Sequence, residues 1–214
     1  MLARMLPAGS PSGKHNPGGW LAVHALAAAG QLEALGTLLS SPQGLSQLDC
    51  RTDTGATAFQ LALHRGEPGA ADCLRSAGCD VEAVTPDGKT AAHFAAEGGN
   101  PQVVELVAAL RLPLDSPQSR YGRRPVHLAA KRGNVEAIAS LQRHGCDLLA
   151  LDGVGRTALH HAAWEGREGA VAYLLDQAPS LSLVVDGQGQ APAEAACPSA
   201  PQLLGMEPMH SLHT

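Results

Sequence analysis

Residues 155 to 166 read GRTALHHAAWEG, and close copies of this stretch return along the chain. The best copies are GKTAAHFAAEGG at 88–99 and GRRPVHLAAKRG at 122–133. Weaker copies begin at residues 20, 55 and 189. The slot that holds histidine in the good copies is occupied in turn by His24, Gln60, His93, His127, His160 and Glu194. The steps are 36, 33, 34, 33 and 34 residues, and a fixed period of this length is the sequence signature of a solenoid.

Each copy predicts the same piece of structure. A short turn such as TPDG comes first, where glycine permits backbone angles that other residues avoid. A short alanine-rich helix follows, and a second helix is predicted where apolar residues recur at helical spacing, as at Val103, Val104 and Val107. The residues placed to cap the first helix with a hydroxyl are Thr57, Thr90 and Thr157. Neither helix is long enough to be stable alone, so each must pack against its neighbours.

The repeated stretch resembles the ankyrin repeat family. The family's T-P-L-H-x-A-A core is matched by 157–163 and partly by 125–130, and its D-x-x-G turn by 152–155 and 186–189. The resemblance implies an all-α fold, an ankyrin-type solenoid of stacked helix-turn-helix repeats with β-turn fingers. It implies about five full repeats plus a truncated C-terminal one, because Pro198 and Pro201 interrupt the last copy.

The period sets the expected domain boundaries. Residues 1–18 are expected to form a disordered N-terminal arm, and 201–214 a flexible C-terminal tail. Between them lies the repeat domain, 19–200, and its units one to six are expected at 19–51, 52–84, 85–118, 119–151, 152–185 and 186–200. The first and last units depart most from the pattern, as end caps of a solenoid do.

The equivalent histidines, His24, His93, His127 and His160, are expected to be structural. Stacked units are about 10 Å apart, so histidines in one slot form a ladder rather than a metal site. The resemblance implies that they and the nearby threonines fasten each turn to its helix. His161 holds a slot usually taken by leucine. With no catalytic motif in the chain, we expect no catalytic residue, no metal and no cofactor.

Binding is expected in a concave groove, which the resemblance assigns to the turn tips and the exposed flank of each first helix. From Ser116 to Val135 there are five cations and no acid, in a chain of net charge -5. Arginine, tyrosine and tryptophan are the residues most enriched at binding hot spots. The candidate partner-binding residues are therefore Arg120, Tyr121, Arg123, Lys131, Arg132, Arg156, Trp164 and Glu165.

These observations favour a monomeric protein-interaction module or adaptor that binds an acidic or phosphorylated segment of another protein, with no small-molecule substrate. One alternative is a peripheral binder of anionic membrane or nucleic acid that uses the same basic patch, and the net charge of -5 argues against it. Another is an interaction domain of a larger enzyme or regulator. A third, an enzyme using His160, His161 and Glu165, has the least support.

Composition bears on the compartment. The five cysteines form no CxxC pair, which is typical of reduced thiols in an intracellular protein. We expect the cytoplasm rather than the nucleus. The first 19 residues contain arginine and serine but no acid, so organelle targeting stays open.

Overall fold

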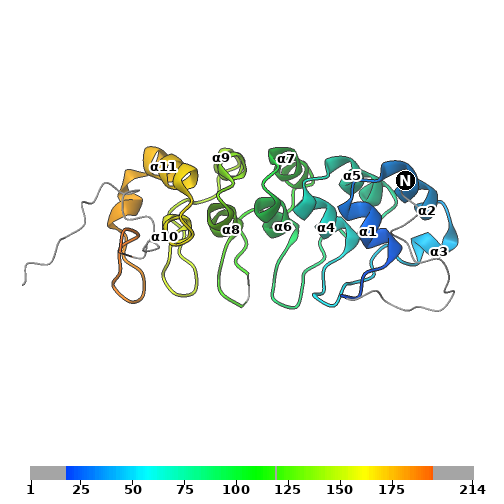
Figure 1. The fold of residues 1–214 in the computed structure, drawn as a ribbon, viewed down its shortest axis with the longest axis horizontal. Helices are drawn as coiled ribbons and strands as arrows, with labels where there is room; N and C mark the ends of the chain where they lie inside the picture. Colours follow the sequence, from blue (N-terminus) through cyan, green and yellow to red (C-terminus); the bar gives the residue numbers. More distant parts are fainter. Residues whose placement is uncertain (1–17, 119, 195–214) are drawn as a thin grey trace, which may run out of the picture.

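The computed structural model describes residues 18–118 and 120–194. Within these ranges the chain forms eleven α-helices and no strand, and the helices stand in two parallel rows above a row of loops (Figure 1). The expectation of an all-α ankyrin solenoid is confirmed. The predicted tail, most of the predicted arm and residues 195–200 of the sixth unit lie outside the described residues.

Each unit contributes an inner and an outer helix. The inner row consists of α1 (Ala22–Ala28), α4 (Ala58–Arg65), α6 (Ala91–Gly98), α8 (Pro125–Arg132) and α10 (Ala158–Trp164). The outer row consists of α2 (Leu32–Leu39), α5 (Pro68–Ser76), α7 (Pro101–Ala109), α9 (Val135–Arg143) and α11 (Glu168–Gln177). Two short elements follow the outer helices of the end units, α3 (Pro42–Leu45) and the 3₁₀ turn η1 (Pro179–Leu183). No described helix is long and apolar enough to cross a membrane.

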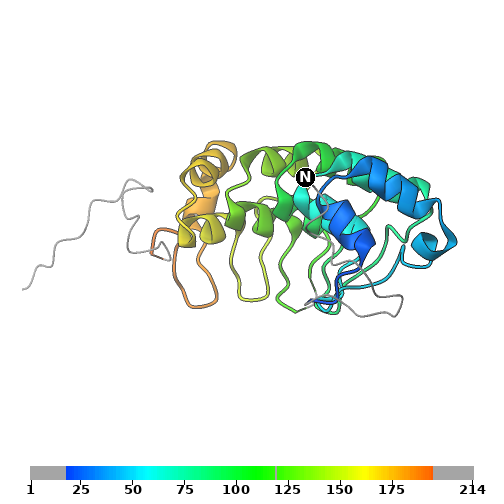
Figure 2. The same cartoon turned by 45° about the vertical axis from the view of Figure 1, so that its right-hand side comes forward.

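Small residues allow the inner helices to approach closely. The slot two residues after the histidine slot holds alanine in four successive units, and each of these side chains is fully buried: Ala62, Ala95, Ala129 and Ala162. Inner helices of neighbouring units pack against one another along the row, as Figure 2 shows from a turned view. The core is therefore a continuous layer that runs the length of the described solenoid, with few aromatic side chains in it.

The loops between units form fingers that bond to one another through the backbone. Each finger is closed by a bond between its two base residues, such as Asp152 N–H to the Arg156 carbonyl at 2.9 Å. Neighbouring fingers are joined by the Gly153 amide, which donates to the Tyr121 carbonyl at 2.8 Å. Gly122 has φ +63°, and a Cβ there would lie 2.7 Å from the Gly153 nitrogen. Only glycine fits this close approach.

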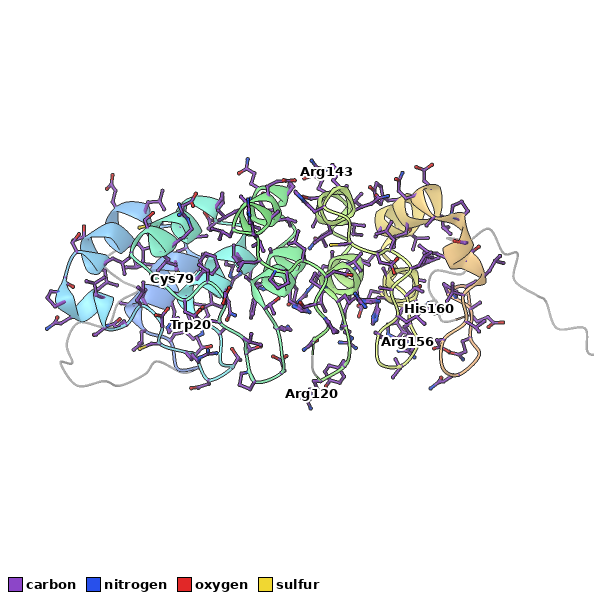
Figure 3. The ribbon with its side chains drawn as sticks, turned by 180° about the vertical axis from the view of Figure 1, so that it is seen from behind. Trp20, Cys79, Arg120, Arg143, Arg156 and His160 are labelled. Atoms are coloured by element: carbon purple, nitrogen blue, oxygen red, sulfur yellow. The ribbon has the colours of Figure 1, made fainter. Side chains whose placement is uncertain are left out.

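The finger that opens unit four is one residue longer than the others. Its closing bond runs from Gln118 to Arg123, a separation of five residues, whereas the finger before it closes from Thr85 to Lys89, a separation of four. The longer finger carries Arg120 and Tyr121, and Figure 3 shows Arg120 at the free end of the fingers, far from Arg143 on the outer row. This insertion also accounts for the step of 34 residues between His93 and His127.

Candidate partner-binding groove

The histidine slot links each inner helix to the finger that follows it. His127 Nδ1 accepts a hydrogen bond from the Arg124 amide at 2.9 Å, and its Nε2 bonds to the Ala150 carbonyl at 2.9 Å. Because the amide must donate to Nδ1, the proton of the ring is on Nε2. The other histidines of the slot also accept from the cap amide at Nδ1 and bond through Nε2 to a backbone carbonyl, although that carbonyl differs: His24 bonds to Cys50, His93 to Arg123 and His160 to Gln190.

The two departures from histidine keep part of this geometry. Gln60 accepts from the Thr57 amide through Oε1 at 3.1 Å and donates from Nε2 to the Ala83 carbonyl at 2.6 Å. Glu194 accepts from the Ala191 amide at 2.9 Å. The residue in this slot must therefore accept a hydrogen bond from the amide of the helix-cap residue three positions earlier. It must also donate a hydrogen bond where the next finger supplies a carbonyl.

The ladder histidines are buried as neutral rings. Burial, together with the neighbouring His161, lowers the pKa of His127 to about 4. Burial also lowers the pKa of His93 and of His160. Thr90 and Thr157 place their hydroxyls 2.9 Å from the Nδ1 atom of their histidines, and the Thr57 hydroxyl accepts from the Gln60 amide at 3.4 Å. These bonds saturate the rings, which leaves no free nitrogen for a ligand.

His161 has a different environment from its neighbour His160. Its Nε2 lies 2.9 Å from Asp152 Oδ2, and its ring packs edge-on against His127 with centroids 5.5 Å apart. Burial by itself would raise the pKa of Asp152, but the hydrogen bond from His161 and the amides of Arg156 and Val154 hold that pKa well below its usual value. The carboxylate therefore ties the finger of unit five to α10. Sequence reasoning identified no partner for His161, since Asp152 was read only as part of a turn.

Two arginines of the long finger share one aromatic ring. The guanidinium of Arg120 lies 5.1 Å from the centroid of Tyr121, and that of Arg123 lies 4.8 Å from it. Tyr121 is 44% exposed. Across residues 18–118 and 120–194, neither arginine forms an ion pair. The two charges are therefore held near the finger tip without a carboxylate to neutralise them.

The other cations of the groove pair with acids of adjacent units. Arg132 bonds to Glu97 of unit three at 2.8 Å. Lys131 lies 3.6 Å from Glu165 of unit five, and Arg156 bonds to Asp186 of unit six at 3.1 Å. The acid-free run in the sequence is thus partly neutralised in the fold, because the acids come from neighbouring units about 33 residues away in sequence.

The candidate residues line two adjoining hollows. One, of about 80 Å³, lies between Arg123, Lys131, Arg156, His161, Trp164 and Glu165. The other, of about 220 Å³, shares Arg123 and Lys131 and adds Tyr121 and Arg132. Trp164 is 56% exposed, with the Arg156 guanidinium 5.5 Å from its ring centroid. Seven of the eight predicted residues therefore lie together, and Arg120 extends beyond them at the tip.

A further hollow in the first half of the groove escaped prediction. It measures about 440 Å³ and lies between Trp20, His64 and Phe94, with Lys89 and Glu97 at its edge. Trp20 begins the first copy of the motif and follows Gly19, so it holds the slot after the finger glycine that Arg123 and Arg156 hold in units four and five. This slot and the aromatic side chain were the signals in the sequence that could have predicted it.

Comparison of the sequence with known protein families and relatives agrees with this architecture. A family model described as ankyrin repeats (3 copies) matches residues 23–112, 68–152 and 110–184. The chain is 34% identical over 146 residues to the NF-kappa-B inhibitor cactus of Drosophila yakuba, which covers 65% of this chain and 28% of that protein.

Two further relatives are much longer than the region they share with this chain. It is 30% identical to the ankyrin repeat protein nuc-2 of Neurospora crassa, over 63% of this chain and 12% of the relative. It is 33% identical to the probable E3 ubiquitin-protein ligase XBOS31 of Oryza sativa, over 61% and 30%. The chain spans less than a third of these relatives. The ankyrin repeat is a non-catalytic protein–protein interaction fold, and the chain belongs to the ankyrin repeat family.

Proposed function

We propose that this chain is a protein-interaction module whose groove, at units four and five, binds an acidic or phosphorylated segment of a partner protein. The observation that carries the proposal is the pair Arg120 and Arg123, stacked on Tyr121 without an ion pair among the described residues. A guanidinium with free donors matches a carboxylate or phosphate in a bidentate geometry.

Trp164 supplies the apolar part of the proposed contact. A desolvated tryptophan can contribute 2 kcal/mol or more to binding, whereas an exposed ion pair contributes about 0.2 to 1 kcal/mol. The arginines would then select the sign of the partner's charge and speed its approach, and Trp164 would hold it. Lys131, Arg132 and Arg156 contribute less in this proposal, because each already has a carboxylate partner.

The alternative of a membrane or nucleic-acid surface has less support. A nucleic-acid backbone or an anionic lipid surface carries many negative charges, so tight binding to it needs many cations that are not already paired within the protein. Glu97, Glu165 and Asp186 already pair with three of the groove cations, which leaves fewer cations for such a surface. A short acidic segment can instead keep its charged side chains at the finger tip and place an apolar side chain against Trp164.

A second candidate is an interaction domain within a larger enzyme or regulator. The greater length of the relatives favours it. The region shared with this chain is 28% of the cactus protein and 30% of XBOS31. Immunoblotting of the native protein from its source cells tests it. A band near 22.0 kDa, the mass of this chain, counts against this candidate, and a much larger band supports it.

The groove proposal is tested by fluorescence anisotropy with a labelled peptide rich in aspartate that carries one phosphoserine, beside its unphosphorylated twin. Arg120→Glu with Arg123→Glu should weaken binding at least about tenfold, mostly by slowing association at low salt. The matched control is Arg75→Glu with Arg143→Glu, which makes the same charge change on the exposed outer helices.

Unchanged affinity in the groove variant, or equal loss in both variants, would show that the groove assignment is wrong. Anionic liposomes and single-stranded RNA serve as parallel probes. Tighter binding to either of them than to the peptide, with the same loss in the groove variant, would favour the membrane or nucleic-acid alternative. Sedimentation of the free protein checks the expected monomer.

A further inference from the structure

The face turned away from the groove has its own regular pattern. Between each outer helix and the next finger, buried and exposed side chains follow one another along the connecting segment. In unit four Leu148 and Ala150 are buried, whereas Asp147, Leu149 and Leu151 are exposed. A turn at residues 148–149, in which the Asp147 carbonyl accepts from the Ala150 amide at 3.3 Å, sets this pattern in unit four.

The exposed positions form rows across the units. The slot directly before each finger base holds an exposed apolar residue in four successive units: Val84, Pro117, Leu151 and Val185. The slot two residues earlier adds Leu149 and Leu183 in the last two of these units. We call these two rows the outer strip. With units about 10 Å apart, three steps extend the outer strip over roughly 30 Å.

The outer strip leads into an apolar hollow between units two and three. This hollow measures about 290 Å³ and lies between Val81, Val84, Ala91, Ala92, Leu112 and Pro113. It shares no residue with the three groove hollows described above.

The hollow also lies on the other side of the inner row of helices. At 100° per residue, the mean direction of Ala91 and Ala92 lies roughly 140° around the α6 axis from the mean direction of Phe94 and Glu97, which line the groove. The outer strip and the groove are therefore separate surfaces.

The charge of this face is opposite to that of the fourth-unit finger. The exposed slots beside the apolar rows hold Asp80, Glu82 and Asp147, and none of these acids forms an ion pair within the described ranges. Asp115 is the one acid of these slots in units two to four that is paired, with Arg124. In the residues described, the exposed slots of units two to five contain no lysine or arginine, and Arg51 of unit one borders them.

We propose that the outer strip is a second docking surface, and that it takes a segment of a partner protein with apolar side chains interspersed with lysine or arginine. An exposed run of valine, leucine and proline is stabilised when an apolar partner covers it. The unpaired carboxylates favour cationic neighbours and repel an anionic membrane. The proposal does not depend on the groove, since a chain with two faces of opposite charge can bind each partner separately.

The test uses a labelled peptide of about 20 leucine and lysine residues in an amphipathic helical pattern, long enough to follow the roughly 30 Å of the strip. Its twin carries glutamate in place of lysine. The test variant is Glu82→Lys with Val84→Ser. The matched control is Glu136→Lys with Leu45→Ser, since Leu45 and Val84 are equally exposed at 47%. Circular dichroism confirms that both variants fold.

The leucine–lysine peptide should bind the parent and the control equally, and the test variant at least about tenfold more weakly. The leucine–glutamate twin should not bind. Equal binding to test and control variants, or binding of both peptides alike, overturns the proposal. If the variant with Arg120→Glu and Arg123→Glu no longer binds the leucine–lysine peptide, the peptide binds in the groove, and the proposal is overturned.

A second copy of the chain is the remaining occupant to distinguish. Analytical ultracentrifugation of the parent and of the variant with Val84→Ser and Leu151→Ser addresses it. A monomer in both cases agrees with the proposal. Self-association of the parent that the two serines abolish would show that another copy covers the strip, and the proposal of a foreign partner would be wrong.

Discussion

His160 and His161 are adjacent in sequence, yet they belong to two regions that are constrained by different kinds of contact. His160 is part of the ladder, in which each unit repeats the same bonds between an inner helix and the next finger. His161 lies at the groove, where it bonds to Asp152, and units one to four have no histidine in its slot. The ladder is constrained by backbone groups that are present in every unit. The groove is constrained only by side chains, and these can change without disturbing the stack.

Substitutions along the chain show the same difference. In the ladder slot histidine is replaced only by Gln60 and Glu194, both of which accept from the cap amide. The groove slot after each finger glycine varies freely, and it holds in turn Ala56, Lys89, Arg123, Arg156 and Gln190. A repeat fold therefore separates the positions that hold it together from the positions that recognise a partner.

The largest loss of stability is expected when a ladder side chain is removed, and this substitution tests whether the ladder stabilises the stack. His127→Ala leaves the Arg124 amide and the Ala150 carbonyl without their partner in a fully buried site. Unsatisfied buried groups and the cavity together should lower the free energy of unfolding by about 2 to 4 kcal/mol. Urea unfolding followed by circular dichroism measures the change.

The sharper form of this experiment is His127→Gln. Glutamine makes both ladder bonds at Gln60, so it should recover most of the lost stability and leave a deficit under about 1 kcal/mol. If glutamine were as damaging as alanine, the two bonds would not be what the slot requires.

Acid should weaken the ladder before it affects the groove. Burial lowers the pKa of His127 to about 4, below its ordinary value of 6.5, so the unfolded chain binds the proton more readily. Stability is therefore complete above about pH 6.5 and is lost as the pH falls toward 4. From His127 alone the loss is about 2 kcal/mol at pH 5. Urea midpoints at pH 7 and pH 5 should differ accordingly, and His127→Gln should reduce the difference. A flat profile would contradict a neutral buried ring.

The sequence alone could predict the ladder, because a slot that recurs at a fixed period shows which residues of different units are structurally equivalent. One slot, read every 33 to 36 residues, predicts a solenoid and the order of its units, and the resemblance to ankyrin repeats implies the role of the histidine. The groove was predictable only as a set of slots. Ion pairs such as Arg132 with Glu97 join residues 35 apart in sequence, and their rotamers depend on the stack. Trp20 holds one of these slots in unit one, but the acid-free run that pointed to the candidate residues lies in unit four.

On the groove side the largest expected effect belongs to Trp164. Its side chain is 56% exposed, so Trp164→Ala should leave the urea midpoint close to that of the parent. Binding to the acidic phosphoserine peptide should weaken about tenfold or more, mainly through faster dissociation. Stopped-flow anisotropy separates the two rates. A large loss of stability with unchanged binding would assign Trp164 to the stack instead.

The smallest expected effect tests whether the groove cations are equivalent. Lys131 and Arg123 line the same two hollows, but Lys131 is paired with Glu165 and Arg123 has no ion pair among the described residues. A paired, partly exposed lysine contributes under about 1 kcal/mol, and removing it also frees a carboxylate that repels an acidic partner. Lys131→Ala should therefore weaken peptide binding about twofold to threefold, and Arg123→Ala distinctly more. With Glu165→Ala added, the lysine variant should recover, because the repelling charge is gone. Equal losses for Lys131→Ala and Arg123→Ala would mean that the partner responds to the summed charge of the groove, in which case the unpaired arginines have no special role.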